Sequence, residues 1–81
     1  MSTGIGVFLM STFGERLKHL RSQHGLTQKD FAKEIGITER AYQNYEINAS
    51  TPTYKMLIAL ADYFDVSLDY LVGRSDDPER R

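Results

Sequence analysis

The residues best suited to chemistry lie together in one short polar segment, 38–47. If residues 39–46 form a helix, its outward face offers hydrogen-bonding groups and no apolar anchor. A face that docks onto another protein normally supplies apolar anchors, so the pattern favours a ligand recognised by hydrogen bonds. The polar side chains on this face are Thr38, Glu39, Arg40, Gln43 and Asn44.

Catalytic and metal-binding chemistry has no matching set of residues. The chain has no Cys, and its two histidines, His19 and His24, are five positions apart and would not lie side by side on a helix. The acidic residues Asp62, Asp65 and Asp69 lack the spacing of a calcium loop. No Gly-rich phosphate loop and no nucleophile turn is present in the sequence. We therefore expect no enzyme activity, no metal site and no cofactor.

Length and composition indicate one small domain. The 81 residues are 41% hydrophobic and 26% charged, with a net charge of −1, which argues against disorder. The apolar run at residues 7–10 is too short to span a bilayer, and residues 1–10 lack the basic start of a signal peptide. We therefore expect a cytoplasmic protein without membrane contact.

Helix signals recur from residue 12 onward, and no segment alternates with period two, so we predict an all-α domain of five short helices. A tight turn at Gly36 joins the second helix, 28–35, to the third, 39–46, and Ala32 is small where the two must cross. The predicted N-cap residues are Thr12, Thr27, Thr38 and Ser67, and the fourth helix is predicted to begin near Thr53. We expect the folded domain to span residues 11–73, followed by a charged and frayed tail, 74–81.

Residues 1–10 differ from the rest of the chain because they are uncharged. Gly4 and Gly6 lie beside a β-branched and aromatic run. Three interpretations stay open: a loose leader, an arm at a subunit contact, or sequence upstream of a functional start at Met10. Loose termini are common, which favours the leader.

Residues 13–73 resemble the Cro/CI-type (XRE, lambda-repressor-like) helix-turn-helix DNA-binding family. The resemblance rests on Gln28 after a capping Thr27, on the pair Ala32 and Gly36, on the closing Tyr45-Glu46, on Pro52 before the fourth helix, and on the phrase 64–73. It implies a compact five-helix domain whose second and third helices form the helix-turn-helix. Helix 39–46 would then be the recognition helix in the major groove, and helix 28–35 would cross the phosphate backbone.

The resemblance gives each polar residue an expected role. Arg40 can pair bidentately with guanine, Gln43 or Asn44 with adenine, and Glu39 can accept from a cytosine amino group. The expected base contacts are Thr38, Glu39, Arg40, Gln43 and Asn44, and the expected phosphate contacts are Thr27, Gln28 and Lys29. Arg21 and Glu46 resemble the family's pair that links the first helix to the end of the third. Tyr42 and Tyr45 are expected to be core residues with hydroxyls at the rim.

The implied function is regulation of transcription, as a repressor bound to a near-palindromic double-stranded DNA operator. By resemblance, a homodimer forms around the last helix, with recognition helices about 34 Å apart and residues 7–9 as a second candidate contact. The expected interface residues are Val66, Leu68, Tyr70, Leu71 and Val72. A separate effector or anti-repressor protein is a further candidate partner. The alternative is an antitoxin-like or co-regulator module of the same fold that acts on a protein partner.

The charge balance shapes how such a domain would bind. Residues 1–47 carry six basic and five acidic side chains, whereas residues 48–81 carry four basic and six acidic ones. The acidic excess therefore falls outside the helix-turn-helix half, which is itself only marginally positive. This predicts weak non-specific affinity for DNA and a modest dependence on salt.

Overall fold

The computed structural model describes residues 12–80 of the chain. The expectations for the leader 1–10 and for the apolar residues 7–9 lie outside this range. Within it, all regular structure is helical, which confirms the predicted all-α class: α2 (Phe13–Gln23), α3 (Gln28–Ile35), α4 (Glu39–Glu46), α5 (Tyr54–Phe64) and α6 (Leu68–Leu71).

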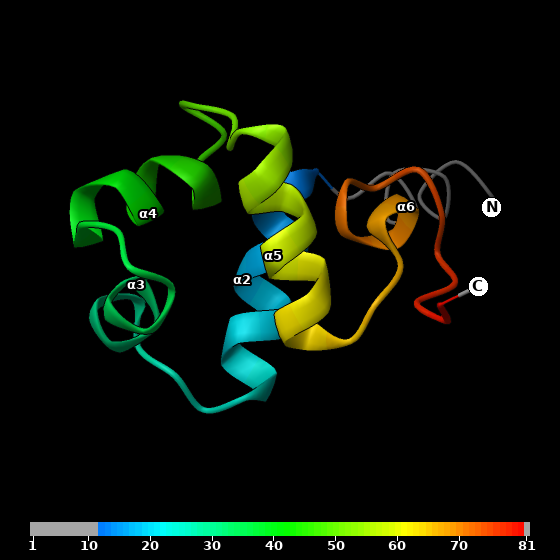
Figure 1. Cartoon of the computed structure of the whole chain (residues 1–81), viewed down its shortest axis with the longest axis horizontal. Helices are drawn as coiled ribbons and strands as arrows, with labels where there is room; N and C mark the ends of the chain where they lie inside the picture. Colours follow the sequence, from blue (N-terminus) through cyan, green and yellow to red (C-terminus); the bar gives the residue numbers. More distant parts are fainter. Residues whose placement is uncertain (1–11, 81) are drawn as a thin grey trace, which may run out of the picture.

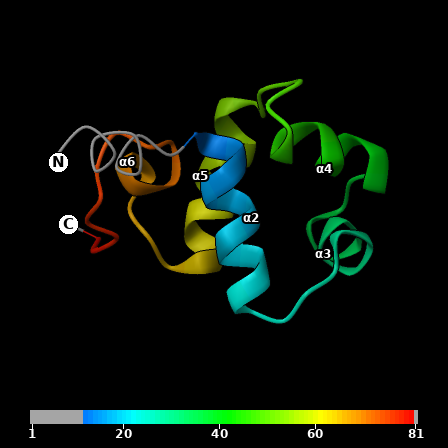
Figure 2. The same cartoon turned by 180° about the vertical axis from the view of Figure 1, so that it is seen from behind.

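The helices divide the molecule into a centre and two ends. Figure 1 shows α2 and α5 in the centre, α3 and α4 together at one end, and α6 with the C-terminal segment at the other; the reverse view in Figure 2 agrees. No helix of the described residues is long and apolar enough to cross a membrane. The arrangement leaves α4 at the surface, away from α6.

Side chains from all five helices and from the α5–α6 turn build a single core. Phe31 of α3 is fully buried, and its ring meets Tyr42 of α4 edge to face at 5.2 Å and Phe64 of α5 at 5.2 Å. The buried apolar residues are Leu17, Leu20, Phe31, Ala32, Tyr42, Leu60, Ala61, Phe64, Val66 and Leu71. The aromatic contacts join the helix-turn-helix end to the central helices.

The predicted helix caps are confirmed. Each of the five N-cap side chains accepts a hydrogen bond from the backbone N–H three residues later, and Thr12 forms the full reciprocal capping box with Glu15. Gly36 ends α3 in the left-handed conformation, with φ of 80°. The sequence predicts the last helix over residues 68–72, but it ends one residue earlier, because Val72 is its C-cap. Local hydrogen bonding therefore sets nearly all the helix boundaries.

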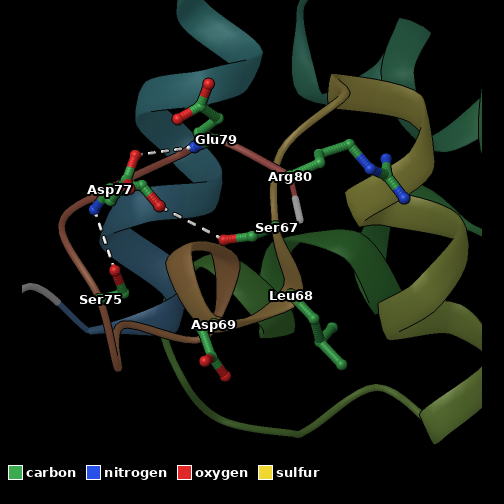
Figure 3. Close-up of a pocket in the computed structure, with 7 residues that line it drawn as sticks. All are labelled: Ser67, Leu68, Asp69, Ser75, Asp77, Glu79 and Arg80. Carbon is green, nitrogen blue, oxygen red and sulfur yellow. Dashed lines mark hydrogen bonds between the residues drawn. The ribbon is translucent and has the colours of Figure 1, made fainter.

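The C-terminal segment 74–80 is packed against the domain, so the prediction of a frayed tail is wrong. The backbone N–H of Ser67 donates to the carbonyl of Pro78 at 2.9 Å, and Ser67, Ser75, Asp77 and Glu79 are linked by hydrogen bonds beside α6 (Figure 3). Farther along, the Arg80 guanidinium donates to the carbonyl of Ala61, near the end of α5, at 3.1 Å.

The physical reason for this packing is a buried arginine. Arg16 is only 7% exposed, and its guanidinium lies 4.2 Å from the centre of the Tyr70 ring. It donates to the carbonyl of Ser75 at 3.0 Å and to the carboxylate of Asp76 at 3.3 Å. A buried cation needs such acceptors, and among the described residues the returning tail supplies them.

Candidate nucleic-acid interface

The helix α4 presents the polar face that the sequence predicted. Thr38, Glu39 and Arg40 are exposed, and Gln43 and Asn44 are half-buried. The opposite face of α4 packs inward through Tyr42 and Glu46, which are 0% and 7% exposed. Thr38 also caps the helix, because its Oγ1 accepts from the N–H of Ala41 at 3.1 Å.

The turn between α3 and α4 fixes the angle at which the two helices meet. Gly36 takes the left-handed conformation, and the N–H of Ile37 donates back to the carbonyl of Ala32 at 3.0 Å. Ala32 is 1% exposed, as expected for a small residue at a helix crossing. Since Ile35 and Ile37 pack against the core on either side of Gly36, the turn is held from both flanks.

A second crossing, between α2 and α4, holds the C-terminal end of α4. A Cβ on Gly14 would lie 2.2 Å from the carbonyl oxygen of Glu46 and 2.8 Å from that of Tyr45, so only glycine fits at this point of α2. The side chain of Asn48 accepts from the N–H of Gly14 at 3.0 Å and donates to Oγ1 of Thr12 at 3.0 Å. Asn48 itself adopts a left-handed backbone, with φ of 61°.

The roles of Gly14 and Asn48 were not predicted from the sequence. The one available signal was a glycine in the first turn of a predicted helix, where glycine is a poor helix former. Nothing in the local pattern of residues 45–50 indicated that Asn48 reaches back across the sequence to the start of α2.

A buried polar cluster locks α4 to α2 and α3. The carboxylate of Glu46 receives Arg21 Nε at 2.6 Å and Gln28 Nε2 at 2.9 Å, and it also accepts from the hydroxyl of Tyr42. Arg21 further donates to the carbonyl of Leu26 at 2.7 Å. The ion pair of Arg21 and Glu46 is largely buried, with 12% and 3% side-chain exposure. Ion pairs on the protein surface contribute little to stability, and this pair is not of that kind.

The cluster shifts the ionisation of its members. Burial raises the pKa of Glu46, but hydrogen bonds from Arg21, Tyr42 and Gln28 and the charge of Arg21 outweigh it, so the net pKa lies below the ordinary value. Burial, followed by the hydrogen bond to Glu46, raises the pKa of Tyr42. The prediction of a Tyr42 hydroxyl at the rim is thus wrong, because the hydroxyl donates to the Glu46 carboxylate inside the buried cluster.

The three residues expected at phosphates differ in their surroundings. Lys29 is exposed, and Thr27 is exposed while capping α3 through a bond from the N–H of Asp30 at 3.0 Å. Gln28 is half-buried, and its amide is already engaged with Glu46 and, at 3.3 Å, with Gln43. Thr27 and Lys29 thus lie at the surface around the start of α3, whereas Gln28 points into the helix-turn-helix.

The surface charge near α4 is smaller than the count of basic residues suggests. Arg16 and Arg21 are engaged in internal ion pairs, Arg16 with Asp76 and Arg21 with Glu46. The exposed basic residues of the segment 12–47 are Lys18, Lys29, Lys33 and Arg40. Among the described residues, no three His, Asp or Glu side chains gather as a possible metal site.

The expected dimer residues lie at the other end of the molecule and divide into two groups. Val66 and Leu71 belong to the core, with 6% and 0% exposure, and are occupied within the single chain. Leu68 is 40% exposed, and Tyr70 and Val72 are half-buried. A partner could therefore reach only these last three from the predicted set.

Comparisons with known proteins agree with this architecture. The family model described as Helix-turn-helix matches residues 17–71. YobD of Bacillus subtilis (strain 168), an uncharacterized HTH-type transcriptional regulator, is 42% identical over 65 residues, which are 80% of this chain and 58% of YobD. YqaE of the same organism, also an uncharacterized HTH-type transcriptional regulator, is 47% identical over 66 residues, with 80% and 57% covered.

A third relative is named for its role in a phage. The cryptic phage CTXphi transcriptional repressor RstR of Vibrio cholerae is 40% identical over 60 residues, which cover 74% of this chain and 54% of RstR. The chain therefore spans between half and three fifths of the length of these three relatives.

Proposed function

Because the chain belongs to the Cro/CI-type helix-turn-helix family of DNA-binding proteins, we propose that it is a sequence-specific regulator of transcription. It acts as a repressor: it occupies a near-palindromic operator in double-stranded DNA through α4 and thereby blocks the promoter. This activity places it in the cytoplasm, with DNA as its principal partner and a separate effector or anti-repressor protein as a means of release.

The observation that carries the proposal is the combination of an exposed polar face on α4 with rigid support behind it. The base-facing side chains would have to meet hydrogen-bonding atoms in the major groove, where an error of about 1 Å breaks a bond. The Gly14 crossing, the Gly36 turn and the buried Glu46 carboxylate each restrain α4 from a different side. An apolar docking helix would need no such restraint of polar groups.

Base recognition rests mainly on Arg40 and Asn44, which are one helical turn apart. Arg40 is exposed in the first turn of α4, and its guanidinium is suited to the O6 and N7 acceptors of guanine. Asn44 is suited to the N6 and N7 edge of adenine. Phosphates would be held by Lys29, by the Thr27 hydroxyl and by the free N–H groups of the first turn of α3.

Dimerisation is the second part of the proposal. The exposed Leu68, with the half-buried Tyr70 and Val72, offers apolar surface around α6, and α5 adds the exposed Tyr54 and Ile58 one turn apart. In sedimentation velocity we expect a dimer at high micromolar concentration that Leu68→Glu dissociates. A monomeric wild-type chain at that concentration would contradict the proposed dimer. Dissociation by Ile58→Glu alone would move the interface to α5.

The direct test of DNA binding is selection from a library of randomised double-stranded DNA, followed by sequencing of the bound pool. We expect an enriched motif with two inverted half-sites, about 10 base pairs apart centre to centre. Capture of bound genomic fragments by the same protein would then locate the operator. A pool with no enriched motif would contradict the proposal and would favour the alternative of a module that acts through a protein partner.

A further inference from the structure

A chain of hydrogen bonds runs from the buried Glu46 to the exposed first turn of α4. Gln28 Nε2 donates to Glu46 at 2.9 Å, Gln43 Nε2 donates to Gln28 Oε1 at 3.3 Å, and Gln43 Nε2 also donates to Glu39 Oε2 at 3.4 Å. The outer two bonds are long and individually weak. We call these four residues the relay: Glu46, Gln28, Gln43 and Glu39.

The direction of every bond in the relay is set at its buried end. Glu46 is ionised beside Arg21, with its pKa lowered, so its carboxylate can only accept. Gln28 must therefore turn its NH2 group toward Glu46, which leaves its carbonyl oxygen facing Gln43. To meet that oxygen, Gln43 must in turn offer its own NH2 group.

The outer end of the relay imposes the same polarity. The carboxylate of the exposed Glu39 is also an acceptor, and it lies one helical turn from Gln43. The single NH2 group of Gln43 thus faces two acceptors, Gln28 Oε1 and Glu39 Oε2. A bidentate pair with adenine needs both a donor and an acceptor directed at the base. The NH2 group of Gln43 already donates to Gln28 and Glu39, so it is not directed at a base.

We propose that Gln28 and Gln43 are positioning residues that hold the Glu39 carboxylate for a base carrying an amino group, with cytosine as the preferred partner. Gln43 then fixes one oxygen of Glu39, and the other oxygen accepts from the cytosine N4 amino group in the major groove. The negative charge rejects guanine and thymine at that position, because their O6 and O4 atoms are acceptors. The inference rests on the proposed function, and it replaces the expected adenine contact of Gln43.

The test uses the same randomised double-stranded DNA library with four variants of the full chain. Glu39→Ala removes the proposed reader, and Gln28→Met and Gln43→Met break the relay at two different links while nearly conserving volume. All three should weaken the preference for cytosine at one and the same base pair of each half-site, by a factor of about five or more. Preferences at the other positions should persist.

Gln23→Met is the matched control, because Gln23 is exposed at the end of α2 and outside the relay. It should leave the whole motif unchanged. Circular dichroism establishes that each variant is folded, and if Gln28→Met unfolds, Gln43→Met decides on its own.

Two results would overturn the inference while leaving the proposed function intact. One is that Gln43→Met and Glu39→Ala alter different base pairs, which would make Gln43 a reader of its own base. The other is that Gln28→Met weakens binding to all sequences equally, as loss of a phosphate contact would. A wild-type pool without any motif would instead overturn both the inference and the proposed function.

Discussion

Substituting Gly14 with alanine tests whether the crossing of α2 and α4 sets the position of the recognition helix. In an ordinary helix the change stabilises a protein by about 1 kcal/mol, because alanine is the better helix former. Here the added Cβ would lie 2.2 Å from the carbonyl oxygen and 2.7 Å from the carbonyl carbon of Glu46. We therefore expect Gly14→Ala to destabilise this protein instead of stabilising it.

The magnitude follows from the atoms that are crowded. Both are backbone atoms of α4, so relief requires α2 and α4 to separate by on the order of 1 Å, since no side chain can rotate away. Overpacking of this kind costs up to about 3 kcal/mol, and the helix-propensity gain offsets roughly 1 kcal/mol of it. The expected net loss is about 2 kcal/mol, which lowers Tm by roughly 8–16 °C for a domain of this size.

The assay is thermal and urea unfolding followed by circular dichroism, with Ser22→Ala as the control. Ser22 is exposed in the same helix, and its replacement should be neutral or slightly stabilising. The displaced α4 should also bind the selected operator more weakly than wild type at a temperature where both are folded. A Gly14→Ala protein as stable as wild type would show that the crossing is loose and would refute the reasoning.

Three other predictions follow from the buried charges and the surface charge. Arg16→Leu should release the tail, so trypsin should cleave after Arg74 faster than in wild type. The free energy of unfolding should fall by only about 1–3 kcal/mol, because the lost partner Asp76 is half exposed and can be solvated by water. An unchanged cleavage rate would contradict the packed tail. Glu46 has a folded-state pKa below its unfolded value, so its stabilising contribution is present above pH 4.5 and is lost as the pH falls below it. Glu46→Gln should be less stable at pH 7 and should flatten the acid limb of stability measured by urea unfolding between pH 3 and 7; parallel curves would argue against this assignment. Because Lys29 is the one charged side chain among the three proposed phosphate contacts, a plot of log affinity against log salt should have a slope of about −2 per dimer, and a slope near −10 would show a more extensive basic surface.

The helices were predictable because their signals are local. Each N-cap at Thr12, Thr27, Thr38, Thr53 and Ser67 acts within three residues of itself, and Gly36 needs no distant partner to adopt its left-handed conformation. The polar face of α4 could be located from helical periodicity alone, and the structure leaves Thr38, Glu39 and Arg40 exposed as expected.

Features that depend on distant pairs could not be predicted in the same way. The contact of Arg16 with Asp76 spans 60 residues, and that of Asn48 with Gly14 spans 34. The residues next to Arg16 and Asn48 in the sequence therefore do not indicate which distant residue each one contacts. The Tyr42 hydroxyl was misplaced for a related reason: only the folded arrangement brings Arg21 and Gln28 to the same carboxylate that it meets. The family resemblance implied a dimer surface at Val66 and Leu71, but both residues are buried in the core, and the apolar pattern of the sequence does not distinguish a core residue from an interface residue.

The central claim is that the outward face of α4 reads bases, and competition binding of Arg40→Ala and Asn44→Ala tests it most directly. The affinity of each variant is measured for the selected operator and for a scrambled duplex of the same composition and length. We predict that each substitution weakens operator binding by about 1–3 kcal/mol and leaves binding to the scrambled duplex nearly unchanged. Equal losses on both duplexes would contradict base reading by α4.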